Sequence, residues 1–522
     1  MAFDSDRISV RARTIAIVGA GPSGVIAAKY LRAEKAFDKI VLLEQRSRPG
    51  GIWNYTGDQR DEDIFSIPQT DPNKGLQKPE WRPKDATTNG GQSKINGANG
   101  TTPSFLAPMY EQLETNIPRS LMRFQGLDWP QDSQLFPKHE TVLKYIEDYS
   151  ADVQHLVQYC TQVTNITPVD ANSPTSPWTV TTTNLLTNSS TTSTFDAVIV
   201  ANGHFIVPYV PPIPGVQAWN AAHPGRITHS KYYRSAAEFS GKKVVVVGNS
   251  ASGADLSNQI SEQCTLPLLW STRSASLFST THGAAGGQDT KRREVAPIAA
   301  FLPETRGVVF EDGQEEHDID FLVFATGYFY SLPFLQDVKP ALITDGGRVN
   351  HTYRHVFFAP RPSLSFLALP QRVIPFPVAE AQAAVVARVY AGRLSLPCLA
   401  EMEEWERGVV EDMGTGRNFH LLNFPKDGVY INEMSTWALS VAERKAAGLE
   451  EEEGVGKNPP MWGAWEFWCR ENFPAIRQAF GKLGRGREKV RDVKELGFNF
   501  EEYKREKERQ EMETKEREKK II

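Results

Sequence analysis

The sequence predicts an α/β fold made of two nested Rossmann-like dinucleotide-binding domains, the first interrupted by the second. An apolar run, a glycine-rich turn and a helix pattern occur together at residues 14–31 and again at residues 242–260. Two more apolar runs, 195–200 and 320–324, end in small residues, and they mark where the chain leaves the first domain and returns to it. The expected parts are 1–206, 207–325 and 326–480, followed by a charged tail, 481–522.

Composition limits the classes of protein that the chain can represent. The chain has 522 residues, of which 40% are hydrophobic, and this is enough for more than one hydrophobic core. Its net charge of −5 argues against a nucleic-acid partner. The four cysteines stand singly without a C-x-x-C pair, so no disulfide framework and no metal site is predicted, and a reducing, cytoplasmic location is favoured. The polar start and the lack of a run of about 18 apolar residues predict neither a signal peptide nor a membrane anchor.

The first glycine-rich segment follows an apolar strand, Ile15–Val18, and completes a G-x-G-x-x-G pattern. In such a unit the glycines allow a tight turn, a close approach of a pyrophosphate and close helix–strand packing. The candidate cofactor-binding residues of this turn are Gly19, Gly21, Pro22, Ser23 and Gly24. A second apolar run, 39–44, ends in Glu44, twenty residues past Gly24, where a carboxylate can accept hydrogen bonds from ribose hydroxyls.

A second glycine pair precedes a large aromatic residue in Gly50-Gly51-Ile52-Trp53. This segment would suit a backbone that passes close to a cofactor, with the indole ring covering one side of it, and the candidate residues are Gly51, Ile52 and Trp53. An ordinary turn with a tryptophan in the core fits the pattern equally well. Residues 57–104 are expected to form an insertion, and the Thr-, Asn- and Gly-rich stretch 85–103 is expected to be a mobile loop.

The remainder of the first part contains two candidate ligand segments. Thr115 and Asn116 precede Ile117-Pro118, which restricts the backbone. A helix pattern at 141–157 and strands at 178–183 and 195–200 follow. The last strand ends at Ala201-Asn202-Gly203-His204, after which a proline-rich stretch forms a stiff connector.

The second unit repeats the plan with two changes. Its turn reads Gly-Asn-Ser-Ala-Ser-Gly, and a serine in place of the middle glycine stays small and can bond a phosphate. The next strand, 266–270, ends at Ser271-Thr272-Arg273 without an acid at the ribose position. Arg273 stands where an arginine accommodates a 2′-phosphate and favours NADP over NAD, the alternative being a surface arginine in a loop. The candidate residues are Gly248, Ser250, Ser252, Gly253 and Arg273.

Two helices are expected in the C-terminal part. One begins near Pro375-Phe376-Pro377, with Pro377 at its first position, and runs to about Leu394. The other, 501–520, has eight acidic and eight basic residues and no apolar stripe, which predicts a solvated helix with i,i+4 ion pairs.

The ordered set of motifs over roughly residues 12–400 resembles the flavin-containing monooxygenase family. The motifs are 19–24, Glu44, 50–53, Tyr110 with Thr115-Asn116, 201–204, 223–233, 248–253 and 324–328. The family signature F-x-G-x-x-x-H-x-x-x-(Y/F) is matched at Gly225, His229 and Tyr233, while His223 replaces its leading aromatic residue. The chain ends Lys-Glu-Arg-Glu-Lys-Lys-Ile-Ile, and in this it resembles the soluble branch of the family.

The resemblance implies FAD in the first unit and NADPH in the second, with a small-molecule substrate and O₂. It places Thr115 and Asn116 at the FAD, with Asn116 as the catalytic residue near flavin N5, and Asn202 among the NADP residues. It also implies that NADPH reduces FAD and that a C4a-hydroperoxyflavin oxygenates a soft nucleophile, sulfur or nitrogen. Turn capping is the alternative role for Asn116.

Four other functions remain open. A Baeyer–Villiger-type monooxygenase carries Trp and then Pro or Asp at the end of the signature, which Tyr233-Arg234 does not match. A flavin disulfide reductase needs paired redox cysteines, and a flavin-bound sensor or scaffold would not need Asn116 and Arg273. An NADPH oxidoreductase without oxygen transfer also stays possible, and the substrate and oligomeric state are left undetermined.

Overall fold

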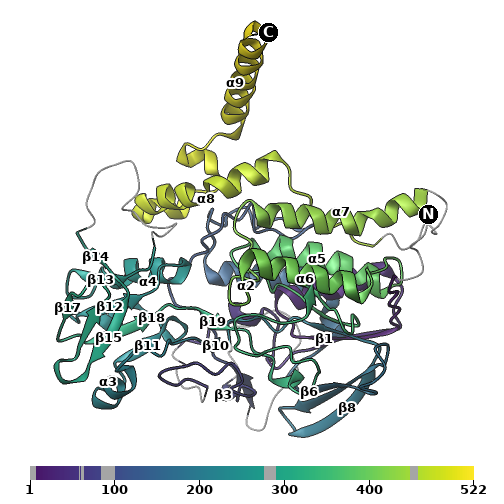
Figure 1. Ribbon diagram of the computed structural model, residues 1–522, viewed down its shortest axis with the longest axis horizontal. Helices are drawn as coiled ribbons and strands as arrows, with labels where there is room; N and C mark the ends of the chain where they lie inside the picture. Colours follow the sequence, from purple (N-terminus) through teal and green to yellow (C-terminus); the bar gives the residue numbers. More distant parts are fainter. Residues whose placement is uncertain are drawn as a thin grey trace.

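The computed structural model describes residues 7–57, 59, 64–83, 100–274, 290–446 and 456–521. Its two largest sheets lie in separate lobes, and the C-terminal helices extend across both (Figure 1). The strands of the second sheet fall between two strands of the first in chain order, so the predicted nested α/β plan is confirmed.

The larger sheet has the order β20-β21-β22-β9-β1-β2-β5. Its strands are β1 (Thr14–Val18), β2 (Lys39–Leu43), β5 (Val157–Gln158), β9 (Ala197–Val200), β20 (Thr352–Tyr353), β21 (Phe357–Phe358) and β22 (Leu364–Phe366). β1 is parallel to both β2 and β9, and Val18 pairs with Leu43 and Val200. The carboxyl ends of these three strands therefore meet at one edge, and the chain order reverses there, between β1 and β9, which is where such sheets bind ligands.

The second sheet is parallel throughout, in the order β11-β18-β12-β13-β14. Its strands are β11 (Ile227–His229), β12 (Val244–Val247), β13 (Leu268–Ser271), β14 (Arg292–Val295) and β18 (Phe321–Phe324). Val247 pairs with both Phe324 and Ser271, so three carboxyl ends again meet beside the glycine-rich turn.

The two chain crossings between the lobes are bonded to each other. β10 (Val207–Pro208) and β19 (Tyr328–Phe329) form an antiparallel ribbon. His229 Nδ1 accepts a hydrogen bond from the Lys231 backbone N–H (3.1 Å), which leaves the proton on Nε2 to donate to the Gly327 carbonyl (3.1 Å). Burial lowers the pKa of His229 to about 3, so this signature histidine is neutral and ties β11 to the second crossing.

Three small sheets complete the strands, and one of them corrects an expectation. They are β3 (Glu80–Pro83) with β4 (Thr101–Ser104); β6 (Thr161–Pro168), β7 (Trp178–Asn184) and β8 (Ser189–Phe195); and β15 (Ile298–Leu302), β16 (Gly307–Phe310) and β17 (Glu315–Glu316). The expected mobile loop 85–103 overlaps the first of these sheets, because residues 101–103 belong to β4 and pair with β3. Gln69, also within the insertion 57–104, is buried and bridges to Val210. Most of the predicted loop, 85–99, lies outside the described residues.

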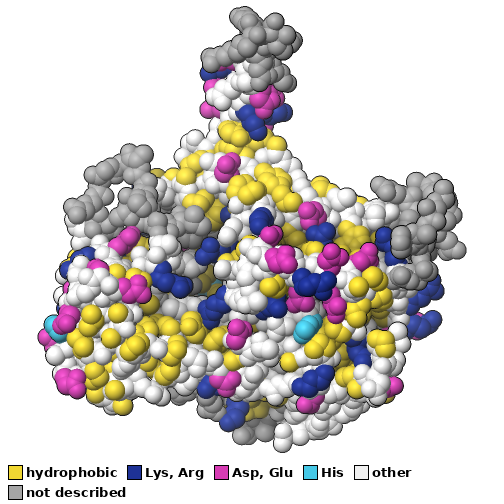
Figure 2. Space-filling model, viewed as in Figure 1, with side chains coloured by type: hydrophobic (Ala, Val, Ile, Leu, Met, Phe, Trp, Pro, Cys, Tyr) yellow, Lys and Arg dark blue, Asp and Glu magenta, His cyan; other side chains and the backbone are white. Residues whose placement is uncertain are grey.

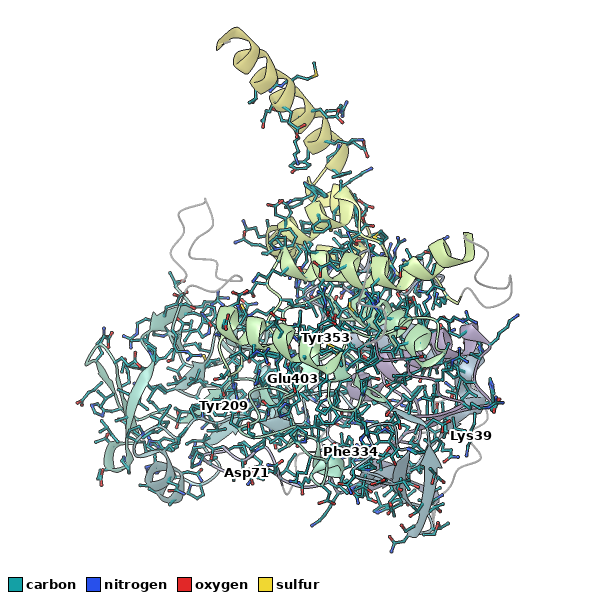
Figure 3. All side chains as sticks on the ribbon, turned by 45° about the vertical axis from the view of Figure 1, so that its right-hand side comes forward. Lys39, Asp71, Tyr209, Phe334, Tyr353 and Glu403 are labelled. Atoms are coloured by element: carbon teal, nitrogen blue, oxygen red, sulfur yellow. The ribbon has the colours of Figure 1, made fainter. Side chains whose placement is uncertain are left out.

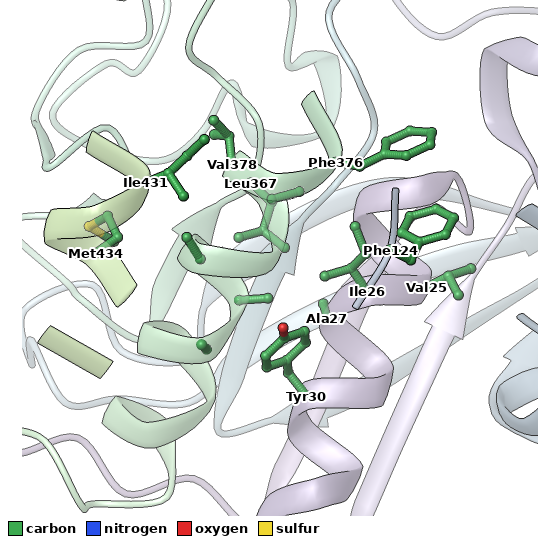
Figure 4. Packing of buried hydrophobic residues seen from close by; sticks show 14 of the residues in the cluster. Val25, Ile26, Ala27, Tyr30, Phe124, Leu367, Phe376, Val378, Ile431 and Met434 are labelled. Carbon is green, nitrogen blue, oxygen red and sulfur yellow. The ribbon is translucent and has the colours of Figure 1, made fainter. Parts of the chain in front are cut away.

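Helices build the largest core. They include α1 (Pro22–Glu34), α2 (His139–Ser150), α3 (Val216–Ala222), α4 (Ala251–Ile260), α5 (Pro375–Tyr390), α6 (Leu399–Met413), α7 (Lys426–Ala446) and α8 (Ala464–Lys482). α5 is buried along almost its whole length and packs between α1 and α7, as Tyr30, Val378 and Ile431 show (Figure 4). The prediction of Pro377 at the first helical position is wrong, because the helix begins two residues earlier, at Pro375.

The final helix, α9 (Phe500–Ile521), projects from the body (Figure 1) and carries charges of both signs on its described surface (Figure 2). It is anchored where Phe500 and Tyr503 contact Trp468, with ring centroids 5.4 and 6.1 Å apart. This agrees with the predicted solvated helix. None of the helices in the described parts of the chain has the length and apolar character that a membrane span requires.

Two candidate dinucleotide sites

The turn after β1 requires glycine at two positions. Gly19 has φ +101°, and a Cβ there would lie 2.8 Å from the Ala201 carbonyl oxygen, on the neighbouring β9 side. A Cβ at Gly24 would lie 2.0 Å from the Gly19 carbonyl oxygen, so only glycine lets α1 pack this closely on the turn. Gly21 has an ordinary φ of −69°, and its Cβ would make normal contact, 3.5 Å, with the Gly51 Cα.

The helix that follows this turn is open at its N-terminus. Gly21 is the N-cap, Pro22 is the first helical residue, and no side chain of the described residues caps the helix. Its first N–H groups therefore keep the capacity to bind a phosphate. Ser23, in the first turn, is half-buried beside them.

Glu44 has a role that the sequence did not indicate. Its buried carboxylate accepts hydrogen bonds from the Ala20 N–H at Oε2 (2.7 Å) and from the Arg46 N–H at Oε1 (2.8 Å). It therefore ties the turn after β1 to the turn after β2. Each oxygen retains a second lone pair, so the predicted acceptance of ribose hydroxyls stays compatible with these bonds.

The Gly50–Trp53 segment packs against the first turn. Gly51 lies beside Gly21, and Ile52 and Trp53 continue the same short 3-10 turn, Gly51–Trp53. Trp53 is half-buried and contacts the main core, so it combines features of both predicted alternatives. Asn54, which the sequence did not single out, holds the turn through bonds from Nδ2 to the Pro49 and Gly51 carbonyls, 3.0 Å each.

Asn116 lies in a segment with a constrained backbone. The Thr115 N–H donates to the Pro137 carbonyl and its hydroxyl donates to the Ile117 carbonyl, both at 2.9 Å. Asn116 itself is half-buried, and its side-chain amide makes no hydrogen bond with any described residue. A turn cap needs such a bond to the backbone, so the structure provides no support for the capping alternative.

The structure places Asn202 at the first site. It follows Ala201, and its Cα lies 3.4 Å from the position of a Gly19 Cβ, so it flanks the first turn rather than the second. His204, two residues on, has its ring 5.1 Å from that of Tyr330, and desolvation lowers its pKa to about 4.

The second turn repeats the first. Gly248 has φ +113° with a Cβ position 2.5 Å from the Ala325 carbonyl oxygen, and a Gly253 Cβ would lie 2.0 Å from the Gly248 carbonyl oxygen. Ser250 is the N-cap of α4 with φ −77° and ψ −174°, close to the −69° and −178° of Gly21. Ser250 and Ser252 are exposed at this turn.

Backbone bonds align the two units residue by residue. The Gly19 N–H donates to the Leu43 carbonyl, and the Gly248 N–H donates to the Ser271 carbonyl. Thr272 therefore occupies the position of Glu44, and Arg273 is one residue further along and exposed. The alignment therefore places Thr272, which is not an acid, where the first unit has Glu44.

A second cation, which the sequence gave no signal for, lies at the same edge. Arg417 donates from Nη1 to the Thr326 carbonyl (3.1 Å), just past β18, and its guanidinium stacks 3.9 Å from the centroid of Tyr209. Tyr209 lies where the two lobes meet (Figure 3). Burial lowers the pKa of Arg417, and the positive charge of Arg273 acts on this pKa in the same direction.

Two glycine cradles with matching geometry, each at the carboxyl edge of a parallel sheet and before an open helix N-terminus, define a protein that binds two dinucleotides. Comparison with known families gives the particular class. Residues 99–286 and 295–426 match the profile described as Flavin-binding monooxygenase-like, and residues 17–66 match that of an NAD(P)-binding Rossmann-like domain. The chain belongs to the flavin-binding monooxygenase-like family. It is a flavin-dependent monooxygenase, and its cofactors are FAD and NADPH.

Individual relatives agree with this assignment. The Arabidopsis thaliana flavin-containing monooxygenase FMO GS-OX-like 2 is 34% identical over 403 residues, covering 75% of this chain and 77% of the relative. The Aspergillus flavus flavin-containing monooxygenase ustF2 is 28% identical and covers 81% and 91%. The structure of S-allyl-L-cysteine S-oxygenase from Allium sativum is 26% identical, with a TM-score of 0.71 over 94% of this chain and 97% of that one.

Proposed function

We propose that this enzyme uses NADPH and O₂ to oxygenate a sulfur or nitrogen atom of a small molecule, releasing NADP⁺ and water. One oxygen atom enters the substrate, and the other leaves as water with the hydride of NADPH and one proton. Bound FAD would supply the activation of O₂, which no protein side chain provides. The observation that carries the proposal is the pair of matched cradles in one chain, since a flavin and a hydride donor need one site each.

Residues of the chain divide between the two sites in this proposal. Parts 1–206 and 326–480 hold FAD at the turn after β1, with Glu44 fixing that turn. Part 207–325 holds NADPH, and Arg273 with Arg417 provides positive charge for its 2′-phosphate. Asn116, whose amide has no bond among the described residues, offers two donors and one acceptor to the flavin edge and to NADP⁺.

Sulfur is the favoured target atom. The Allium sativum structure is named an S-oxygenase, and it covers almost the whole of this chain. The disulfide reductase alternative loses support, because all four cysteines are unpaired and three are buried. The same unpaired cysteines support a cytoplasmic location.

The test of this function compares wild type with Asn116→Ala. A panel of thiols, sulfides, amines and a cyclic ketone is supplied with NADPH, and product, hydrogen peroxide and NADPH consumption are measured together. Wild type should oxygenate a thiol or sulfide with little peroxide. Asn116→Ala should keep its FAD and reduce it within about tenfold of the wild-type rate, while peroxide replaces product because the oriented amide is lost.

A matched control is Asn172→Ala, since Asn172 is an exposed asparagine in a turn of the same lobe. It should leave the ratio of peroxide to NADPH unchanged. Ester formation from the ketone alone would favour the Baeyer–Villiger alternative. Peroxide without product from any substrate in wild type would mean an oxidoreductase that does not transfer oxygen.

A further inference from the structure

A buried acid stands two residues before Asn116 and binds the C-terminal region. The Glu114 side chain is only 5% exposed. Its Oε1 accepts hydrogen bonds from Gln134 Nε2 and Arg487 Nε, both at 3.1 Å, and its Oε2 accepts from Arg477 Nη2 at 3.2 Å. Arg477 belongs to α8 and Arg487 to the 3-10 helix Gly484–Lys489, both beyond the residues that match the family profile.

The arginine on α8 is itself held in place by aromatic packing. The Arg477 guanidinium lies 5.0 Å from the Phe136 ring centroid and 5.4 Å from that of Phe480. These two rings contact each other at 4.8 Å. The Leu135 N–H donates to the Val490 carbonyl (2.8 Å), so the C-terminal region and residues 135–139 form one packed layer.

That layer in turn fixes the backbone on both sides of Asn116. Glu114 and Lys138 form a β-bridge, and the Thr115 N–H donates to the Pro137 carbonyl. The Arg119 N–H donates to the Leu135 carbonyl (2.8 Å). The backbone on both sides of Asn116 is therefore hydrogen-bonded to residues 135–138, and these residues pack on the C-terminal region.

Arg477 also lies near the second unit. Its charge favours the ionised form of Asp255 on α4, against the burial that raises the pKa of that carboxyl group. Asp255 accepts hydrogen bonds from the Tyr110 hydroxyl and from Gln259 Nε2 (3.1 Å). One arginine thus stands where the Asn116 segment, the helix of the second unit and the C-terminal helix meet.

We propose that residues 464–490 act as a positioning element for Asn116, through the ion pairs of Arg477 and Arg487 with Glu114. This inference rests on the proposed function, in which Asn116 directs oxygen to the substrate. Removing Arg477 takes away one of the two positive charges that compensate the buried Glu114 carboxylate, and neutralising Glu114 leaves both arginines without that partner. Losing a partner of a buried ion pair is destabilising, so we expect the segment that carries Glu114 to shift. A displacement of about 1 Å can cost up to roughly 100-fold in a reaction that depends on orientation.

The experiment uses the full-length holoenzyme with Arg477→Met and Glu114→Gln. The ratio of peroxide to NADPH consumed should rise roughly threefold or more, while FAD content and the KM for NADPH stay at wild-type values. Hydrogen–deuterium exchange of residues 113–119 should become faster in both variants. Arg477→Lys, which keeps the charge, should restore much of the wild-type ratio.

Glu488→Gln is the matched control. Glu488 pairs with Lys138 at 3.2 Å and joins the same two segments, but both side chains are at least half exposed. Exposed pairs contribute little, so neither the exchange rate nor the peroxide ratio should change.

Combining Arg477→Met with Asn116→Ala separates this proposal from the function on which it rests. If Arg477 acts through Asn116, the double variant should leak no more peroxide than Asn116→Ala alone. An additive increase, or unchanged exchange and ratio in Arg477→Met, would overturn the positioning role. An Asn116→Ala enzyme with the wild-type ratio of peroxide to NADPH consumed would overturn the proposed function instead.

If Arg477→Met does not fold, Arg487→Met at the more exposed arginine gives the same readouts. Unchanged values of the ratio and of the exchange rate in Arg487→Met would reject the proposal.

Discussion

The two nucleotide units share a backbone plan but differ in what surrounds their turns. In the first, Glu44 is buried, and both of its oxygens accept bonds from neighbouring turns, while Gly51 lies against Gly21. In the second, the corresponding position is Thr272, and the residues facing the turn, Ser250 and Arg273, are exposed. The helix α1 also packs on α5 within the largest core of the protein.

This difference matches two kinds of cofactor behaviour. A turn held by buried bonds and packed against a second loop suits a cofactor that stays bound through many turnovers. A turn bordered by exposed hydroxyls and cations suits one that binds, reacts and leaves, because charged groups at an open edge favour fast association. We infer that FAD is retained in the first unit and that NADPH exchanges at the second.

The largest expected effect comes from replacing with alanine, one at a time, the two equivalent residues that follow β2 and β13. Glu44→Ala leaves two buried N–H groups without partners, each costing about 1–3 kcal/mol, so FAD affinity should fall roughly 30-fold or more. Thr272→Ala should leave both FAD affinity and the KM for NADPH within about twofold of wild type. FAD titration of the apoprotein measures the first value, and steady-state kinetics measures the second. Similar losses in both variants would remove the distinction between the units.

A smaller and more selective effect is expected at the open edge. Arg273→Ala would remove the proposed charge-assisted contact to the 2′-phosphate, and such a contact is worth about 1.5–3 kcal/mol, so the KM for NADPH should rise roughly 10- to 150-fold. NADH lacks that phosphate, so its KM should hardly change. Arg293→Ala is the control, because Arg293 is an exposed arginine of the neighbouring β14 that pairs with Glu316. An equal loss with both nucleotides would mean that Arg273 is structural.

The comparison also shows what can be predicted from the sequence. The strands, turns and helices of both units were predicted because their signals are local: an apolar run, fixed glycine spacing and a helix pattern. The ordered hairpin within 57–104 was missed, since its stability comes from contacts such as the bridge from Gln69 to Val210. Asn202 was predicted to bind NADP, and that role stays a prediction. The structure adds that Asn202 lies beside Gly19 because β9 neighbours β1.

Side chains that the fold brings together from distant parts of the chain were not predicted, because no sequence pattern indicates such contacts. Arg417 reaches the second unit through Thr326 and Tyr209, and Glu114 is bonded by Arg477 and Arg487. The four charged residues among them have no distinctive pattern in their local sequence. Only the fold shows that their side chains meet.

The central claim, one retained flavin and one exchangeable nicotinamide cofactor, is tested most directly by a pair of matched variants. Gly21 and Ser250 are the N-caps of α1 and α4 with nearly the same φ and ψ, so each backbone accepts a side chain. Gly21→Glu and Ser250→Glu each place a carboxylate where the unit would bind a phosphate. The measurements on both variants are the absorbance spectrum, the FAD content and the reduction of the flavin by NADPH or dithionite. Gly21→Glu should be folded and colourless. Ser250→Glu should be yellow, with about one FAD per chain that dithionite reduces and NADPH does not. A Gly21→Glu protein replete with flavin, or a folded Ser250→Glu protein that has lost its flavin, would contradict the account.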